Sequence, residues 1–331
     1  MAISELRGKL ATSVIGSFPL SYNEKNMRLA LEDQLKAGID YPSPPQLQDM
    51  TMMLLKPLAE QKCGIEIRGD EAWLVSNLTT PKSPFSVEDL DWTLRYLKVH
   101  NYEKTVRGVK VPVTGPVTLA SVTKILKDTY AIKYPDIILS FADVVGEIVR
   151  WQHEHGATMI SIDEPTIPYA FWLGISEDVV VEAVDRALSR AGGCITALHI
   201  CGELRGIGRT LLKTKAQILD HEFKAIPKNL EEYRKVDIEH HDKLVGLGSV
   251  RTKPQTETGI AIESVDEIKQ FILKAGDKFG LENLVIFPDC GFGSLKDHYP
   301  DEKEAQATAS KKLANMVQAV KKIRKEHLKQ Q

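Results

Sequence analysis

Two residue types that bind transition metals stand two positions apart in the stretch His199-Ile200-Cys201. Because alternate side chains of a β-strand point to the same face, a strand through this stretch would place the imidazole and the thiol side by side. A buried histidine and a buried cysteine of an ordinary core could have the same spacing. Glu222 and Cys290 extend the pair to a candidate metal site, on the condition that the fold brings the ends of separate strands together.

One imidazole, two thiolates and one carboxylate form a ligand set that suits zinc, whereas magnesium and calcium select oxygen ligands. We therefore expect one Zn²⁺ bound by His199, Cys201, Glu222 and Cys290. A thiol substrate that joined this site would lose its proton, because a thiol bound to a divalent cation is deprotonated. The alternative is a structural zinc site, closed by four protein ligands and without room for a substrate.

The remaining cysteines and His221 are weaker candidates for this site. His221 precedes Glu222 and cannot share its strand face, so it is only a substitute ligand. Cys63 and Cys194 have no neighbouring ligand in the sequence, and we expect both to be buried, inert thiols.

Short β-branched runs that alternate with amphipathic segments supply the elements that would position these residues. Eight runs are predicted to be strands: Thr12–Ser17, Ile65–Asp70, Lys110–Gly115, Thr158–Asp163, Ile195–Cys201, Gln217–Glu222, Lys243–Ser249 and Leu284–Cys290. Four of the segments between or after them are long predicted helices: Asp136–His153, Glu177–Arg190, Ser264–Phe279 and Glu302–His327. Repeated strand-helix units predict an α/β protein with a (β/α)8 TIM barrel, and an open doubly wound sheet is the alternative.

The chain shows no break in composition that would divide it into domains. No linker rich in Gly, Ser or Pro bisects it, so residues 1–331 are expected to form a single barrel domain. Tyr41–Gly64 and Leu74–Tyr102 exceed the length that a minimal barrel needs, and we expect extra helices and loops after the first two strands. The proline-rich stretch Pro42–Pro45 is predicted to be a loop.

Composition argues against several classes of protein. Lys and Arg number 43 and Asp and Glu 45, which gives a formal net charge of −2 and no general basic field for a nucleic acid. No stretch approaches the ~20 apolar residues of a membrane span, and four cysteines are too few for a disulfide scaffold. We expect a cytoplasmic enzyme with neither a nucleic-acid nor a membrane partner.

Five motifs resemble, in order, the catalytic C-terminal barrel of cobalamin-independent methionine synthase. They are Ile15-Gly16-Ser17-Phe18-Pro19, Gly115-Pro116-Val117-Thr118, Ile162-Asp163-Glu164-Pro165, His199-Ile200-Cys201 and Pro288-Asp289-Cys290-Gly291. The resemblance extends from about Thr12 to the last helix. The resemblance does not include the family's large N-terminal domain. We therefore expect the chain to be similar to the short, core-only forms of the family.

The resemblance implies a methyltransferase that moves a methyl group to the thiol of L-homocysteine and forms L-methionine. It places the family's zinc ligands on the four residues named above. The stretch Ile15-Gly16-Ser17 corresponds to the site for the homocysteine carboxylate, and Asp163 corresponds to the partner of its ammonium group. A further acidic contact of the family corresponds to Asp70, with Glu71 as the second choice.

Two departures from the family concern the methyl donor. Where the family has a Trp that packs against folate, this chain has Leu119-Ala120-Ser121-Val122. Where the family has an Asp-x-His pair that protonates the folate leaving group, this chain has Arg251-Thr252-Lys253. A methyl-corrinoid needs no such proton, so we expect methylcobalamin or a separate corrinoid protein, rather than methyltetrahydrofolate, as the donor.

Two other functions stay open at this point. One is methyl-corrinoid:coenzyme M methyltransferase, or another thiol alkyltransferase on the same zinc barrel, whose family also resembles the stretch His199-Ile200-Cys201-Gly202. Asp163 argues against it, because a sulfonate thiol has no ammonium group for this carboxylate to bind. The other is a non-catalytic protein that binds zinc or a thiol.

Overall fold

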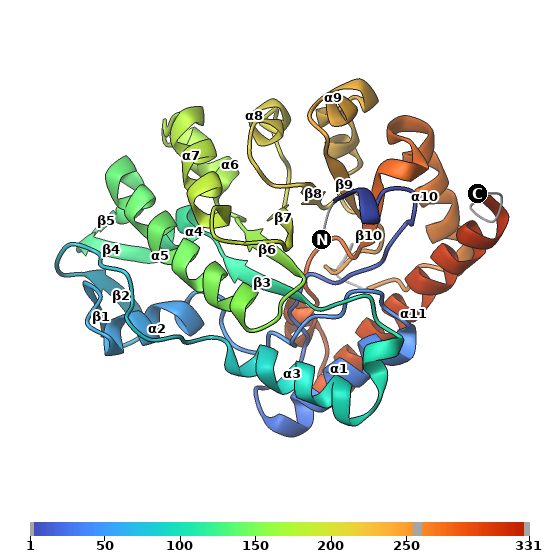
Figure 1. Ribbon diagram of the computed structural model, residues 1–331, viewed down its shortest axis with the longest axis horizontal. Helices are drawn as coiled ribbons and strands as arrows, with labels where there is room; N and C mark the ends of the chain where they lie inside the picture. The colour runs from blue at the N-terminus through green and yellow to red at the C-terminus, as the bar shows by residue number, and fades with distance from the viewer. Residues whose placement is uncertain (1–2, 254–259, 328–331) are drawn as a thin grey trace.

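The computed structural model describes residues 3–253 and 260–327, and its centre is a six-stranded sheet (Figure 1). The strand order is β10-β9-β8-β7-β6-β3, and every neighbouring pair is parallel. The strands are β3 (Lys110–Thr114), β6 (Met159–Asp163), β7 (Ile195–Ile200), β8 (Ile218–His221), β9 (Leu244–Gly248) and β10 (Leu284–Phe287). Each falls within a strand predicted from the sequence, which confirms the α/β class with a parallel sheet.

Two extended segments, residues 12–17 and 41–46, close this sheet into a ring. The first makes a parallel bridge to Ile286 of β10, and the second is bridged to the first at two points. The second segment also reaches β3, where the carbonyl of Pro42 accepts a hydrogen bond of 2.9 Å from the backbone N–H of Lys110. The ring thus contains eight segments, of which six are regular strands.

The second position in this ring differs from the prediction. The sequence predicts Ile65–Asp70 there, and this prediction is wrong. β1 (Ile65–Arg68) instead pairs antiparallel with β2 (Glu71–Leu74) in a separate four-stranded sheet of order β1-β2-β4-β5. β4 (Thr123–Leu126) and β5 (Thr129–Tyr130) complete that sheet, which lies at the edge of the molecule (Figure 1).

The segment 41–46 takes the second position although its prolines predict a loop. Proline has no backbone N–H and cannot continue a ladder of hydrogen bonds. With proline at positions 42, 44 and 45, the segment can form single bridges to its neighbours but no regular strand. The sequence therefore lacks the pattern of a strand at a place where the fold needs one.

Helices cover the outside of the ring and connect its segments (Figure 1). The α-helices are α1 (Glu24–Ala37), α2 (Met52–Glu60), α3 (Glu88–Val99), α4 (Pro116–Val122), α5 (Pro135–Glu154), α6 (Ile167–Trp172), α7 (Glu177–Leu188), α8 (Gly208–Leu212), α9 (Lys235–His240), α10 (Val265–Phe279) and α11 (Glu302–His327). Short 3₁₀ helices are η1 (Ile3–Glu5), η2 (Tyr102–Lys104), η3 (Ala131–Lys133), η4 (Pro227–Glu232), η5 (Leu281–Asn283) and η6 (Gly293–His298). The four long helices predicted from the sequence correspond to α5, α7, α10 and α11. No described helix has the length and apolarity needed to cross a lipid bilayer.

Alternation of side chains along the strands separates the interior of the ring from its outer face. Most inward positions near the amino ends of the strands are apolar and belong to one buried cluster, which includes Met159, Ile195, Ile218 and Leu244. The exception is Lys110 of β3, the register partner of Met159. Outward positions pack under the helices in a second, larger cluster. Further along the same strands the inward positions become polar, so the carboxyl end of the sheet is where chemistry can take place.

Glu164 shows how the residue after a strand fixes the next helix. Its buried carboxylate accepts hydrogen bonds of 2.8 Å from the backbone N–H groups of Val117 and Thr118, and one of 2.7 Å from the Thr118 hydroxyl. A Cβ on Gly115 would lie 2.3 Å from the carboxyl carbon of Glu164, so a side chain does not fit there. Burial raises the pKa of Glu164 to about 7, against the effect of these donors.

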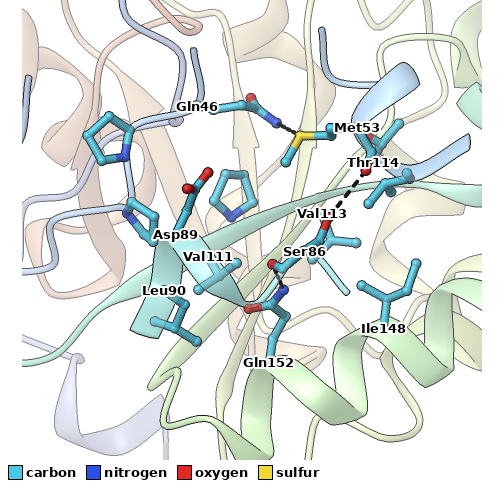
Figure 2. A pocket seen from close by; sticks show the side chains of 14 residues that line it. Gln46, Met53, Ser86, Asp89, Leu90, Val111, Val113, Thr114, Ile148 and Gln152 are labelled. Carbon is cyan, nitrogen blue, oxygen red and sulfur yellow. Dashed lines mark hydrogen bonds between the residues drawn. The ribbon is translucent and has the colours of Figure 1, made fainter. Parts of the chain in front are cut away.

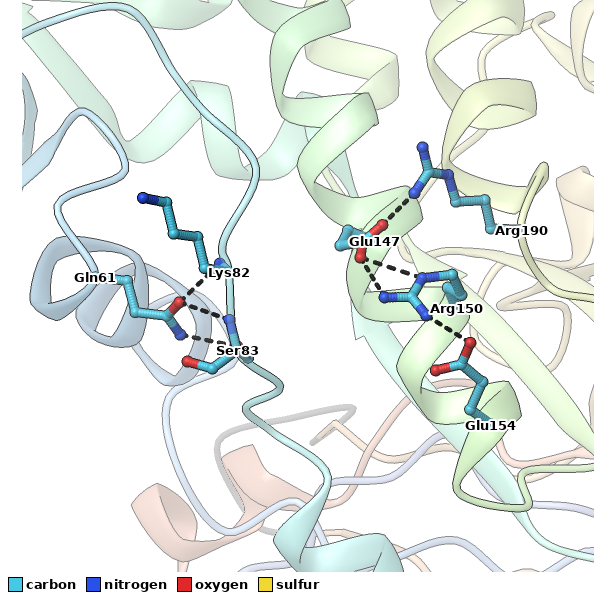
Figure 3. Close-up of polar contacts among 7 residues, drawn as sticks. All are labelled: Gln61, Lys82, Ser83, Glu147, Arg150, Glu154 and Arg190. Atoms are coloured by element: carbon cyan, nitrogen blue, oxygen red, sulfur yellow. Dashed lines mark hydrogen bonds and ion pairs between the residues drawn. The ribbon is translucent and has the colours of Figure 1, made fainter.

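A surface network on α5 offers a contrast (Figure 3). Glu147 pairs with Arg150 in the next turn and with Arg190 just beyond α7, and Arg150 also pairs with Glu154. The side chains of Arg150 and Arg190 are 36% and 50% exposed, so solvent screens their charges. Such pairs each contribute little to stability.

Glu164→Gln is expected to lower the free energy of unfolding by about 1–3 kcal/mol at pH 8.5, because its amide NH₂ would face backbone donors and leave one without an acceptor. Glu147→Gln is the control, with an expected loss below about 1 kcal/mol. Urea unfolding followed by circular dichroism measures both losses. Equal losses in the two variants would contradict the role given to Glu164.

Candidate metal centre

Three donor atoms meet at the carboxyl end of the sheet. His199 lies near the end of β7, Cys201 directly follows that strand, and Cys290 comes shortly after β10. His199 Nε2 lies 3.0 Å from Cys201 Sγ, and the Sγ atoms of the two cysteines are 2.8 Å apart. All three donor atoms lie within 4.8 Å of one another, a spacing at which one cation can contact them all.

Asp220 fixes the orientation of the His199 ring. The two residues are register partners on β8 and β7, and Asp220 Oδ2 lies 3.1 Å from His199 Nδ1. Both side chains are buried. A hydrogen bond from Nδ1–H to this carboxylate leaves the Nε2 lone pair directed at Cys201, and metal-binding histidines are commonly supported in this way.

The electrostatics of the three donors favour a thiolate. The hydrogen bond with Cys201 and the proximity of His199 lower the pKa of Cys290 to about 5, although burial opposes this. The same hydrogen bond, together with burial, raises the pKa of Cys201 well above its ordinary value. A divalent cation would stabilise both sulfurs as thiolates, so two thiols and an imidazole with a carboxylate behind it are donors that fit zinc.

Glu222 lies near this group but has an ion pair of its own. Its side chain is 3% exposed, and Oε1 accepts a hydrogen bond of 2.7 Å from Lys253 Nζ. The negative charge of Glu222 raises the pKa of Cys201, so the carboxylate acts on the centre electrostatically. The set of donors that lie within 4.8 Å of one another does not include it, and its role as a ligand stays a prediction.

Asp163 stands in the same row as His199. The two are register partners on β6 and β7, and Asp163 is 4% exposed. The hydroxyl of Ser161, two residues earlier on the same strand, donates a hydrogen bond of 2.6 Å to Asp163 Oδ1. A buried carboxylate held in this row can bind the cationic group of a ligand that reaches the metal centre.

Ile15, Gly16 and Ser17 connect the ring to the loop that follows β10. The carbonyl of Ile15 accepts a hydrogen bond of 2.7 Å from Lys110 Nζ. The hydroxyl of Ser17 accepts one of 3.1 Å from the backbone N–H of Gly293. The stretch implied to bind the substrate carboxylate is thus attached both to β3 and to the start of η6, shortly after Cys290.

Asp70 lies in the exposed turn between β1 and β2, outside the ring. It lines an open cavity of about 610 Å³ together with Lys56, Ser121 and other residues. The neighbouring Glu71 pairs with Lys124. The metal donors do not line this cavity, and the contact of Asp70 with a substrate stays a prediction.

A small, partly open cavity lies in the wall of the ring (Figure 2). Gln46, Asp89, Thr114 and Gln152 are among the residues that line it. Its volume is about 30 Å³, which leaves room for about two water molecules. Gln152 Oε1 is buried without a hydrogen-bond partner among the described residues, so a water molecule can satisfy it. The cavity is too small for an amino-acid substrate.

Sequence reasoning does not single out Asp220 or Lys110, which both contact the site. Asp220 shares a strand face with Glu222, so the alternation that pairs His199 with Cys201 also indicates an inward carboxylate here. Lys110 begins β3, and the three residues that follow it are apolar. A lysine in a buried strand is the available signal for a charge inside the ring.

These features define an α/β fold with a candidate His/Cys/Cys metal site at the carboxyl end of a parallel sheet. Residues 56–322 match the family described as cobalamin-independent synthase, catalytic domain, and the chain belongs to this family. It is therefore a methyltransferase of the methionine synthase type.

Relatives match the chain over most of its length. The methionine synthase of Methanothermobacter marburgensis is 29% identical over 333 aligned residues, which cover 94% of this chain and 99% of the relative. A B12-independent methionine synthase from Shewanella sp. W3-18-1, solved in complex with selenomethionine, has a TM-score of 0.68 at 20% identity and covers 97% of this chain and 99% of its own. A methyltransferase from Methanosarcina mazei has a TM-score of 0.60 at 17% identity, and the match covers 95% of this chain and 94% of the methyltransferase. The two solved structures share the fold.

Asp220→Asn is expected to weaken zinc binding by about 10–100-fold, because an amide no longer stabilises the His199 tautomer that presents Nε2 to the ion. Competition with a chromophoric chelator measures the affinity. Asp185→Asn is the control, since Asp185 accepts a hydrogen bond from the backbone of Lys215 outside the site. Unchanged zinc affinity in Asp220→Asn would contradict the orienting role.

Proposed function

We propose that this chain transfers a methyl group to the thiol of L-homocysteine and forms L-methionine at a zinc ion. The observation that carries the proposal is the meeting of His199, Cys201 and Cys290 beside the buried carboxylate of Asp163. Two sulfurs and an imidazole suit zinc, and the carboxylate suits the cationic end of an amino acid. The methionine synthases among its relatives support the same substrate.

Bound zinc would supply a Lewis acid that lowers the pKa of the substrate thiol and keeps its sulfur nucleophilic. In this proposal His199, Cys201 and Cys290 hold the ion, and Asp220 keeps the imidazole oriented. The protein then gains rate by holding the sulfur in line with the methyl carbon of the donor.

Glu222 is the fourth ligand that the resemblance implies. Its carboxylate is bound to Lys253, so in this proposal it divides its interactions between that ammonium and the ion. Lys253 also brings a positive charge close to the two thiols, which offsets part of their negative charge.

Asp163 and the stretch Ile15–Ser17 are the proposed binding sites for the amino-acid end of the substrate. Asp163 would pair with the ammonium group, and Ser161 keeps the carboxylate turned toward the interior. The main chain and hydroxyl at Ser17 would bind the carboxylate. With both ends of the amino acid held, the side-chain sulfur has a defined position relative to the zinc ligands.

Asp163→Asn is expected to retain one zinc per chain and to weaken homocysteine binding by at least about tenfold, or 1.4 kcal/mol. The amide keeps the size of the carboxylate and an acceptor for Ser161 but loses the charge. Isothermal titration calorimetry and metal analysis measure the two properties. Cys290→Ser, in contrast, should lose both zinc and activity. Normal homocysteine affinity in Asp163→Asn would contradict its assigned partner.

We further propose that the methyl donor is a methyl-corrinoid, either methylcobalamin or a corrinoid protein. A tertiary amine leaves only when a general acid protonates it. Lys253 stands where the family has its proton donor, and its bond to Glu222 raises the pKa of the ammonium although burial opposes this. A lysine held in this way is a poor acid at neutral pH. Leu119, buried on α4, also offers no aromatic face to folate.

Zinc-loaded protein with homocysteine is expected to form methionine from methylcobalamin at least tenfold faster than from methyltetrahydrofolate. Methionine is quantified by mass spectrometry under anaerobic conditions. Coenzyme M in place of homocysteine tests the alternative acceptor and should react poorly, because Asp163 finds no ammonium group. Efficient methionine formation from the folate alone would contradict the proposed donor, and preference for coenzyme M would contradict the proposed acceptor.

A further inference from the structure

Lys110 is a buried lysine that the proposed reaction does not use. Its side chain lies fully buried inside the ring, and its Nζ donates a hydrogen bond of 2.7 Å to the carbonyl of Ile15. Burial lowers the pKa of Lys110, although the charges of Asp163 and Asp220 oppose this, and its Nζ lies 5.9 Å from the centre of the Phe287 ring. Burial of a charge costs several kcal/mol unless partners compensate it, so the interior position requires an explanation.

The segment that Lys110 contacts has little regular support. Residues 12–17 join the ring through isolated bridges rather than a continuous ladder. Gly16 in this segment has a φ of +154°, and a Cβ there would lie 2.7 Å from Cγ of Pro112. The segment therefore lies directly against β3, and the Lys110 side chain is a polar connection between the two.

β3 also determines the position of Asp163. The strand pairs with β6 so that Lys110 is opposite Met159 and Thr114 is opposite Asp163. The ammonium and carboxylate groups of an α-amino acid are attached to one carbon, so the sites that bind them must keep a fixed separation. A connection between the Ile15 carbonyl and β3 sets this separation.

We propose that Lys110 is a positioning residue for homocysteine. Through the Ile15 carbonyl it holds the carboxylate-binding segment at a fixed distance from Asp163. The inference rests on the proposed function and assigns to Lys110 a contribution to recognition of the amino-acid end, not of the thiol. A thiol that lacks this end has nothing for Lys110 to position.

Lys110→Met is compared with Lys243→Met, a matched control. Lys243 is also buried, and its Nζ donates hydrogen bonds to the carbonyls of Thr214 and Ala216 in the loop before β8. Both variants lose a buried ammonium bound to main-chain carbonyls, but only Lys110 is bound to the substrate segment. Zinc-loaded proteins are titrated with L-homocysteine and with 2-mercaptoethanol by calorimetry, and KM and kcat are measured with methylcobalamin.

Lys110→Met is expected to keep one zinc per chain and to raise the Kd and KM for homocysteine at least tenfold, while kcat changes less than threefold. Its affinity for 2-mercaptoethanol should equal that of the wild type. Lys243→Met should change the Kd for homocysteine less than twofold, whatever its loss of stability. If Lys110 contributed only to stability, Lys110→Met would change the Kd values for homocysteine and 2-mercaptoethanol equally. Its effect would also match that of Lys243→Met.

A Kd for homocysteine in Lys110→Met within twofold of the wild type would overturn the inference, and so would equal losses for homocysteine and 2-mercaptoethanol. If Lys110→Met does not fold, Lys110→Gln is compared with Lys243→Gln by the same measurements and with the same expected directions. A wild-type chain that binds zinc but not homocysteine would overturn the proposed function and the inference together. If the wild type binds homocysteine and Lys110→Met binds it with the same Kd, only the inference about Lys110 would be overturned.

Discussion

The register of three parallel strands determines where the chemistry of this protein can take place. β6, β7 and β8 pair so that Asp163, His199 and Asp220 form one row on the inner face of the ring. Parallel strands end at the same edge, so Cys201, two residues beyond His199, comes next to Cys290 from a strand far along the chain. No single element could supply an imidazole, two thiols and two carboxylates at this spacing. A shift of one residue in the register would turn the row to the outer face.

The interior of the ring also concentrates charges that would be costly in isolation. Asp163 and Asp220 are buried carboxylates, and the low pKa of Cys290 adds a thiolate. The amine of Lys110 faces both carboxylates, and the ring of His199 is hydrogen-bonded to Asp220. Compensation is therefore shared among several groups rather than confined to one ion pair, and a divalent cation would complete it. The same arrangement makes each member sensitive to the loss of any other.

Most of the fold follows from the sequence, and the exceptions have physical causes. Six strands are recognisable because buried parallel strands are continuously apolar. The proline segment 41–46 is not recognisable, because proline removes the ladder that defines a strand. The alternating pattern of Ile65–Asp70 predicts a strand but does not show which sheet it joins. Period two predicts that His199 and Cys201 share a strand face, and the structure brings them together. The ion pair of Glu222 with Lys253 could not be foreseen, because it depends on the path of the loop after β9.

The ring is least regular along residues 12–17 and 41–46. Six strands are joined by continuous ladders, whereas residues 12–17 and 41–46 are joined by single bridges. Local opening requires fewer broken hydrogen bonds at such a place than elsewhere in the ring. One wall of the ring, which carries His199 and Cys201, thus has continuous ladders, and the opposite wall, which carries Ile15 to Ser17, has isolated bridges. A small molecule that contacts both walls would restrict the motion of the irregular segments. Part of its binding free energy would then offset the loss of conformational entropy in those segments.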